Sequence, residues 1–328
     1  MRKRNMMNNI ENLFDLAIKQ IQESENIYIV SHVQPDGDNI GSILALWMAL
    51  KYIKERVFIL KTDEIPSDFL FLPNINIINE YNHDDNIDLL ITLDTSDESR
   101  LGKNKDLLNQ AKTIINIDHH ISNINFGHIN IVDSNAAATG ELVYKLINRL
   151  KIPINKDIAS CIYTAISSDT GSFMYDNTSA ETHEIAAELI RTGIDKGNIN
   201  INLYQSRSIE RTMLFAKALE TLKLYFENKV AIVKITRSMV EEVNAKMEDT
   251  EGIVSFIREI ASVEVATILK EFNEEEIKVS MRSKRYVDVS SLCANLGGGG
   301  HIRAAGCTIN SPIDIAEELI LNELEKVF

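Results

Sequence analysis

Four short clusters of acidic residues and histidines have the residue types and spacing of a metal site. In chain order they span Ser31–Ser42, Leu93–Asp97, Ile117–His120 and Ser167–Gly171. Carboxylates that gather in one place repel one another, so either some of them stay protonated or cations balance their charge. Two divalent cations would balance the four negative charges of the aspartates that stand out in these clusters, namely Asp36, Asp38, Asp94 and Asp169.

His32 and His119 add neutral nitrogen ligands to this set of oxygen ligands. Mixed nitrogen and oxygen ligands suit manganese, iron, cobalt or zinc and are a poor match to calcium. Two such ions about 3.5–4 Å apart activate a bridging water and bind a phosphoryl oxygen. The pattern therefore predicts hydrolysis of phosphoesters. Taken singly, each cluster has a simpler interpretation as a turn or a helix cap, and its repetition in four places favours the metal site.

The elements around the clusters predict how they are brought together. Three clusters follow short apolar segments typical of buried strands, and the fourth follows the helix predicted over Asp157–Ser168. Alternation of such strands with helices indicates an α/β domain with a mostly parallel sheet, whose carboxyl ends share one edge. The strands are expected at Asn26–Val30, Arg56–Leu60, Asp88–Leu93 and Thr113–Ile117, with further helices at Ile40–Tyr52 and Glu181–Arg191.

A second kind of motif lies near the C-terminal end. Four glycines, Gly297–Gly300, precede His301, and the segment Lys278–Arg285 holds four basic residues in eight. Consecutive glycines let backbone amides approach an anion closely. A basic strand followed by such a loop favours a phosphate-binding site, although a solvated charged strand and a flexible turn would look the same.

The length of 328 residues suggests two domains. We expect the metal-binding domain over residues 1–191, a linker rich in Gly and Asn over 192–212, and a smaller α/β domain with a mixed sheet over 213–328. The second domain is expected to contain strands at Val230–Ile235, Val263–Leu269 and Ile277–Met281 and a helix at Ile313–Lys326. Domain interfaces often hold active sites, so we expect a cleft between the two domains.

Composition excludes several classes of protein. The net charge of −14 disfavours binding to long duplex DNA, because phosphate binding needs positive charge. The longest apolar run, Ile43–Leu50, is too short to span a bilayer, and the basic start lacks the apolar segment of a secretory signal. Three cysteines form no disulfide framework. These features favour a cytoplasmic protein without a membrane partner.

The motifs resemble those of a known superfamily. His32-x-x-x-Asp36-x-Asp38, then Asp94, Asp118-His119-His120 and Asp169 resemble the four motifs of the DHH phosphoesterases. The segment Gly297–Gly306 is similar to the hallmark of their DHH-associated C-terminal domain. Two further segments, Ala137–Val143 and Thr170–Phe173, resemble the branch that holds bacterial nanoRNases and pAp phosphatases.

This resemblance implies roles for individual residues. One metal would be held by His32, Asp36 and Asp169, and the other by Asp38 and His119, with Asp94 bridging them. His120 would contact the scissile phosphate and assist as an acid, and Asp118 would orient its neighbours. The group expected to bind the end of the substrate consists of Arg282, Ser283, Gly298, Gly299, Gly300 and His301.

The activity that the resemblance implies is that of a manganese-dependent 3′–5′ oligoribonuclease, with magnesium or cobalt as alternative ions. It would degrade RNAs of two to five nucleotides to mononucleotides and dephosphorylate 3′-phosphoadenosine 5′-phosphate (pAp) to AMP. A homodimer is one state that the family allows. Met174 departs from the polar or basic residue that related members often carry nearby, which affects the expected substrate preference.

Other functions remain open at this point. The nearest alternative is cleavage of cyclic di-AMP or of its linear product pApA. A type II inorganic pyrophosphatase shares the first four motifs but carries a lysine-rich C-terminal signature instead of the glycine run. An exonuclease for long strands usually has additional nucleic-acid-binding domains. A regulatory nucleotide-binding module would lack at least one metal ligand, and here the expected ligands are all present.

Overall fold

The computed structural model describes residues 2–79 and 86–328, with side chains described from residue 10 onward. The chain divides into two compact units, Met1–Ser206 and Arg207–Phe328. The division falls inside the segment 192–212 for which a linker is predicted. That segment also contains helix α6 (Lys196–Tyr204) and the first residues of α7 (Ile209–Glu220).

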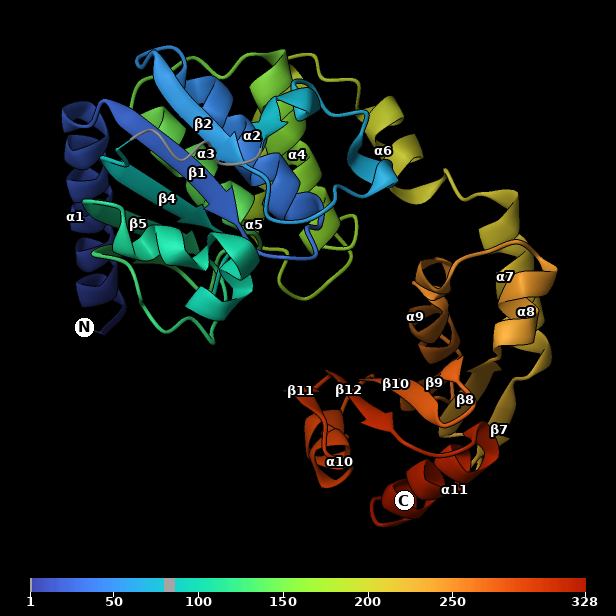
Figure 1. The fold of residues 1–328 in the computed structure, drawn as a ribbon. Coiled ribbons are helices and arrows are strands. Elements are labelled where there is room, and N and C mark those ends of the chain that lie inside the picture. The colour runs from blue at the N-terminus through green and yellow to red at the C-terminus, as the bar shows by residue number, and fades with distance from the viewer. Residues whose placement is uncertain (1, 80–85) are drawn as a thin grey trace. The chain divides into compact units, whose positions relative to one another are not determined.

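The first unit is built on a six-stranded sheet in which every neighbouring pair of strands is parallel (Figure 1). The strand order is β3-β2-β1-β4-β5-β6, and the central strands are almost entirely buried. This confirms the parallel sheet expected from the sequence. The strands are β1 (Asn26–Ser31), β2 (Arg56–Leu60), β3 (Ile78–Asn79), β4 (Leu89–Leu93), β5 (Thr113–Asp118) and β6 (Ile129–Val132).

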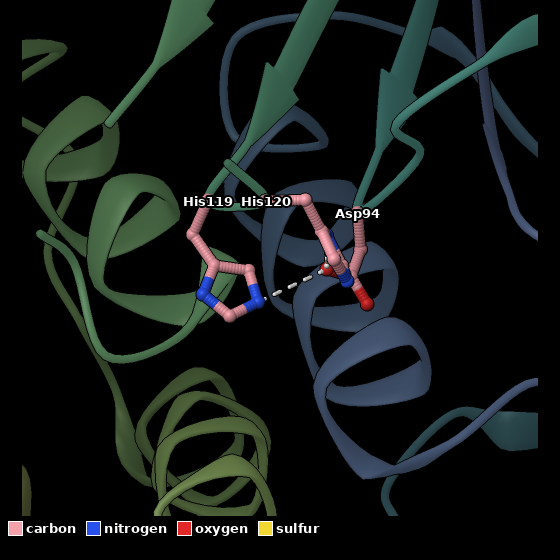
Figure 2. A group of neighbouring side chains, drawn as sticks. All are labelled: Asp94, His119 and His120. Carbon is pink, nitrogen blue, oxygen red and sulfur yellow. Dashed lines mark ion pairs between the residues drawn. The ribbon is translucent and has the colours of Figure 1, made fainter. Parts of the chain in front are cut away.

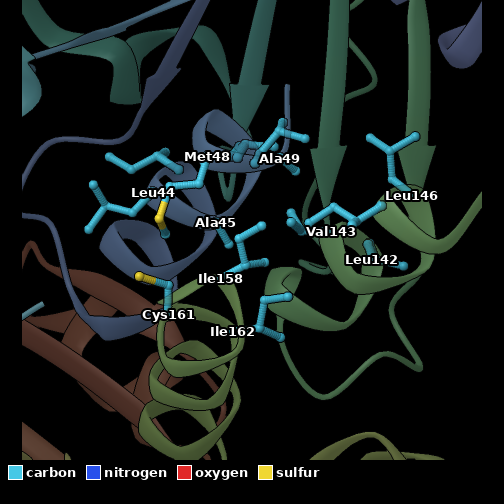
Figure 3. Close-up of a cluster of buried hydrophobic side chains, with 14 of the residues drawn as sticks. Leu44, Ala45, Met48, Ala49, Leu142, Val143, Leu146, Ile158, Cys161 and Ile162 are labelled. Atoms are coloured by element: carbon cyan, nitrogen blue, oxygen red, sulfur yellow. The ribbon is translucent and has the colours of Figure 1, made fainter. Parts of the chain in front are cut away.

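Helices cover this sheet and build its core. Every residue of α2 except Trp47 is buried, and α2 packs against α3 and α4 through a cluster of aliphatic side chains (Figure 3). Gly41 lets α2 and α4 approach closely, because a Cβ atom there would lie 2.4 Å from the carbonyl oxygen of Cys161. The helices of this unit besides α6 are α1 (Arg2–Glu23), α2 (Gly37–Leu50), α3 (Thr139–Arg149), α4 (Lys156–Asp169) and α5 (Ala180–Arg191), with 3-10 segments η1 (Ser67–Phe69), η2 (Ile75–Ile77) and η3 (Glu98–Asn109).

The second unit has a mixed sheet in the order β11-β12-β10-β9-β8-β7, in which only β8 and β9 pair in parallel among its neighbouring strands. This confirms the smaller mixed α/β domain. The strands are β7 (Lys223–Tyr225), β8 (Val230–Ile235), β9 (Val265–Asn273), β10 (Glu276–Ser283), β11 (Gly299–His301) and β12 (Ala304–Ile309). Besides α7, the unit contains α8 (Arg237–Glu242), η4 (Met247–Thr250), α9 (Ile253–Arg258), α10 (Val289–Asn295) and α11 (Ile313–Glu325).

No helix among the described residues is both long enough and apolar enough to cross a membrane.

Candidate active site

The carboxyl ends of three neighbouring strands carry the first residues of the site. His32 follows β1, Asp94 follows β4, and His119 follows β5. The sheet has the order β3-β2-β1-β4-β5-β6, so successive strands are added on one side of β1 up to β3 and on its other side from β4 onward. The strand order therefore reverses between β1 and β4. Open α/β sheets bind ligands outside the strand ends at such a reversal. The predicted convergence at one sheet edge is therefore present in the structure.

The N-terminus of α2 adds two aspartates to this edge. Asp36 is the N-cap, and one of its carboxylate oxygens accepts a hydrogen bond from the backbone N–H of Asn39 at 3.0 Å. Asp38 lies in the first turn of the same helix and is buried. The simpler role of Asp36 as a helix cap is thus real, and its second carboxylate oxygen still faces His32 at 3.9 Å.

His32 forms one group of potential ligands with Asp36 and Asp94. Its Nε2 atom lies 3.2 Å from Oδ2 of Asp94. Its Nδ1 atom donates to the carbonyl oxygen of Val33 at 2.7 Å, which leaves Nε2 directed at the carboxylates. A histidine ligand held through its other ring nitrogen is the usual arrangement around protein-bound metals.

His119 forms a second group with Asp38 and Asp169. Its Nε2 atom lies 3.4 Å from Oδ2 of Asp169, 3.8 Å from Oδ2 of Asp38 and 3.7 Å from Oδ1 of Asp94. The structure thus places Asp169 with Asp38 and His119, whereas the resemblance implied that it joins His32 and Asp36.

Asp94 lies between the group around His32 and the group around His119. Its Oδ2 atom faces His32. Its Oδ1 atom faces His119 and, at 3.6 Å, Nδ1 of His120 (Figure 2). The backbone of Asp94 adopts a positive φ of 55°, a conformation that aspartate tolerates better than most residues. This turn at the end of β4 points the carboxylate back between the neighbouring strand ends.

The N-terminus of α3 holds two of these carboxylates, which the sequence analysis did not anticipate. Backbone N–H groups of Thr139 and Gly140 donate to the two oxygens of Asp38 at 2.6 and 2.9 Å. The hydroxyl of Thr139 donates to Oδ1 of Asp94 at 3.0 Å. Unpaired N–H groups at a helix start favour anions, and here two of them hold Asp38 while the Thr139 hydroxyl holds Asp94.

Asp118 orients the imidazole of His120 through a hydrogen bond. Its Oδ1 atom lies 2.7 Å from Nδ1 of His120, and its Oδ2 atom accepts from the side-chain amide of Asn123 at 2.6 Å. Asp118 is fully buried, whereas 36% of the His120 side chain is exposed. The hydrogen bond to Asp118 and the charge of Asp94 outweigh burial and raise the pKa of His120 to about 9.

Positive charge is needed to balance the buried carboxylates of the site. Burial and repulsion by Asp94 and Asp169 raise the pKa of Asp38 well above its usual value, and burial raises that of Asp169 to about 6. Burial acts in the same sense on Asp94, but its hydrogen bond to His32 and the neighbouring imidazoles lower its pKa to about 2. The ion pairs described for these carboxylates all join them to the imidazoles of His32, His119 and His120. Such a set of oxygen and imidazole donors fits divalent metal ions.

Met174 lies in the loop that follows Asp169, and its side chain is 77% exposed. Three consecutive residues of this loop have positive φ, namely Gly171, Ser172 and Phe173. Only glycine adopts that conformation without strain, so the loop is held in an unfavourable backbone shape. Hydrogen bonds from the amides of Met174 and Tyr175 to the carbonyl of Thr170 maintain it.

In the second unit, the structure brings Arg282 and His301 into one row of the sheet. Arg282 on β10 pairs with Ala304 on β12, and Ala304 pairs in turn with His301 on β11. Residues directly opposite each other on antiparallel strands point to the same face. The guanidinium and the imidazole therefore flank a small alanine side chain on one face of the sheet.

Other predicted residues of this unit are placed differently. Ser283, the next residue after Arg282, is buried, and its hydroxyl donates to the carbonyl of Ile302 at 3.4 Å. The amide of Gly298 donates to the carbonyl of Cys293 at 2.8 Å. Gly299 and Gly300 are exposed and belong to β11 at the edge of the sheet.

Comparison with known proteins matches each unit. Residues 26–166 match the model of the DHH family, N-terminal domain, and residues 227–328 match that of the DHHA1 domain. Proteins from Thermus thermophilus and Bacillus subtilis, both named bifunctional oligoribonuclease and PAP phosphatase NrnA, are 34% and 26% identical. The alignments cover 92% and 90% of this chain and 89% and 92% of those proteins.

A crystal structure of an exopolyphosphatase-related protein from Bacteroides fragilis is also similar. It is 30% identical, has a TM-score of 0.90, and the match covers 96% of each chain. Because the Thermus relative is 34% identical over nearly the whole chain and both domain models match in the expected order, the chain belongs to the DHH family and ends in a DHHA1 domain.

Proposed function

We propose that this protein is a metal-dependent phosphoesterase that hydrolyses RNAs of two to five nucleotides to mononucleotides and dephosphorylates pAp to AMP. The observation that carries the proposal is the convergence of six potential metal ligands at one sheet edge. They are His32, Asp36, Asp38, Asp94, His119 and Asp169. The names of the Thermus and Bacillus relatives support the choice of substrates.

We assign the two ion positions from the geometry. His32 and Asp36 would hold one ion, Asp38, His119 and Asp169 would hold the other, and Asp94 would contribute one oxygen to each. The opposite orientation of the two Asp94 oxygens supports the bridging role. Bound ions would supply an activated water and neutralise a phosphoryl oxygen, and manganese suits these mixed ligands.

His120 would act on the substrate itself. It is the most exposed of the three imidazoles in the site, and Asp118 holds its Nδ1 atom, so Nε2 is available to donate. Its raised pKa keeps it protonated near neutral pH. In this form it would donate a hydrogen bond to a phosphate oxygen and a proton to the departing ribose oxygen.

The second unit would bind the anionic end of the substrate. The row formed by Arg282 and His301 presents a guanidinium and an imidazole on one sheet face. Guanidinium groups bind phosphate through paired hydrogen bonds. Recognition of a terminal group would make cleavage count in from the end of the substrate, which would explain a preference for very short RNAs.

Hydrolysis of four substrates by the purified protein in Mn2+ tests the proposal. The panel comprises pAp, a dinucleotide, a long single-stranded RNA and cyclic di-AMP. We expect rapid conversion of pAp and the dinucleotide and little release from the long RNA. Preference for cyclic di-AMP would favour the alternative of a cyclic-dinucleotide phosphodiesterase, and inactivity on all four would contradict the assignment of substrates.

A further inference from the structure

Tyr204, the last residue of α6, is hydrogen-bonded to the end of α4. Its hydroxyl donates to the carbonyl oxygen of Ser167 at 2.6 Å, and it lies 2.9 Å from the hydroxyl oxygen of Ser167. Ser167 is two residues from Asp169, in the last turn of the helix. The carbonyls of a last helical turn lack partners within the helix, so this one depends on donors from elsewhere.

Asp169 itself has little that holds its carboxylate. Asp38 accepts hydrogen bonds from Thr139, Gly140 and Ser42. Within the described residues, the Asp169 side chain contacts only Nε2 of His119 as an ion-pair partner and accepts no hydrogen bond. Its position must therefore be set by the backbone of the turn that carries it.

The backbone carbonyl of Asp169 accepts a hydrogen bond from the side-chain amide of Asn177 at 3.1 Å, and the preceding residues of the turn are confined from two sides. On one side, a Cβ atom at Gly37 would lie 2.5 Å from the side chain of Ser168, so α2 closely approaches the turn between Asp36 and Asp38. On the other side lies Tyr204, together with the amide of Ser172, which donates to the same Ser167 carbonyl at 2.7 Å.

Helix α6, which carries Tyr204, is packed into the first unit. Its residue Ile199 is 3% exposed and belongs to the core of the first unit, and α6 packs against α4. Burial raises the pKa of the Tyr204 hydroxyl, which therefore remains a donor throughout the neutral range.

We propose that Tyr204 is a positioning residue for the metal site: its hydroxyl fixes the last turn of α4 and thereby holds the Asp169 carboxylate beside His119. This inference rests on the proposed role of Asp169 as a metal ligand. It assigns a function to the final residue of α6, which lies outside all four sequence clusters. The side chain would act through the Ser167 carbonyl and would not touch the substrate.

The variant Tyr204→Phe tests the proposal because it removes the hydroxyl and keeps the ring. The affinity of the metal-free protein for Mn2+ can be measured by electron paramagnetic resonance of the free ion. In the variant, we expect this affinity to weaken about tenfold at one of the two sites. That value is the lower end of the effect seen for residues that support metal ligands. The kcat for pAp should fall at low Mn2+ and recover at high Mn2+, with KM for pAp unchanged. A merely structural role would not shift the Mn2+ dependence.

Two further variants make the result interpretable. Tyr52→Phe is the matched control, since its hydroxyl also has a hydrogen bond, accepted from Asn155 at 3.0 Å, in the same unit. Asp169→Ala is the reference for loss of the ligand. If Asp169→Ala binds Mn2+ like the parent protein, the proposed metal site fails. If Asp169→Ala weakens binding while Tyr204→Phe matches Tyr52→Phe, or only lowers thermal stability, the role of Tyr204 is overturned.

Discussion

At the scale of single residues, Asp94 is the side chain on which the proposed site depends most. It is 2% exposed, and it is the only aspartate of the described metal-binding groups that contacts all three of His32, His119 and His120. A bridging carboxylate cannot be replaced by a neutral amide without loss of charge at both ion positions.

We therefore expect Asp94→Asn to lower kcat for pAp by roughly a thousandfold or more, since metal ions contribute several kcal/mol to such reactions. The nearby Asp97→Asn is a matched control, because Asp97 caps η3 and has no contact with the three histidines. Steady-state kinetics of the two variants decide the question, and an active Asp94→Asn enzyme would refute the bridging role.

The sequence allowed prediction of the side chains that carry charge but not of the groups that hold them. His32, Asp38, Asp94 and His119 stand out by type and spacing. The segment Ala137–Val143 was noted only as a resemblance, and its contact with Asp38 was not predicted because it is made by backbone N–H groups at a helix start, which any residue type offers. Tyr204 lies far along the chain from Ser167, and no local pattern connects them.

At the scale of elements, the close contact of α2 with α4 positions the two helix ends that bear Asp36, Asp38 and Asp169. Gly41 permits this contact, since an added Cβ would meet the backbone oxygen of Cys161 at 2.4 Å. The backbone of α4 cannot move aside as a flexible side chain would.

Gly41→Ala should therefore lower the free energy of unfolding by about 1–3 kcal/mol, the usual cost of overpacking. Gly197→Ala in α6 is the matched control, because an added Cβ there meets only the Asp195 carboxylate at 3.5 Å. Alanine has the higher helix propensity, so that variant should be neutral or stabilised by up to about 1 kcal/mol. Urea denaturation measures both, and equal stability of Gly41→Ala and the parent protein would contradict the packing argument.

In the second unit, Glu264 holds the segment after β10. The buried carboxylate accepts hydrogen bonds from the backbone N–H groups of Arg285, Tyr286 and Val287 at 2.7–3.1 Å. Burial acts to raise its pKa, but these hydrogen bonds and the charge of Arg303 lower it overall. A carboxyl with a lowered folded pKa stabilises the fold fully above its ordinary pKa and loses this effect as the pH falls through the folded value.

Glu264→Gln should therefore destabilise the protein by about 1–2 kcal/mol at pH 7, because a charged acceptor is replaced by a neutral one. The difference from the parent protein should shrink as the pH drops below about 4, where the parent carboxyl also becomes neutral. Thermal unfolding over this pH range gives the comparison, with the exposed Glu259→Gln as the control for the change in net charge. A pH-independent difference would exclude the linkage.

Most of the predicted strands and several of the predicted helices match the structure to within two residues, because short β-branched runs and capped apolar segments are strong local signals, whereas the strands β3, β6, β7 and β12 were not predicted. Helix α1 was missed, although Phe14, Ala17 and Ile21 have helical spacing and are buried. Its many polar residues obscured that stripe. The glycine run predicts a loop where the structure has β11, because only its pairing with β12 makes this segment a strand.

At the scale of the whole molecule, the proposed function assigns the metal site to the first unit and the binding of the anionic end of the substrate to the second. The chain carries a net charge of −14, so an anionic substrate needs local positive charge. In the proposed substrate site, Arg282 on β10 would provide this charge within the second unit.

Arg282→Ala should raise KM for pAp by about tenfold or more, as expected when a charged hydrogen bond to phosphate is lost, with a smaller effect on Mn2+ binding. Lys278→Ala removes the same charge from the same strand, where Lys278 lies against the ring of Phe272, and should leave KM near the parent value. Equal KM values for the two variants would remove Arg282 from the proposed substrate site.

The most direct test of the account is a titration of the metal-free protein with Mn2+ that follows bound ion and release of AMP from pAp in the same samples. We expect two ions per chain, no AMP without metal, and AMP formation that rises as the sites fill. Release of AMP by the metal-free protein, or failure to bind Mn2+ at all, would contradict it.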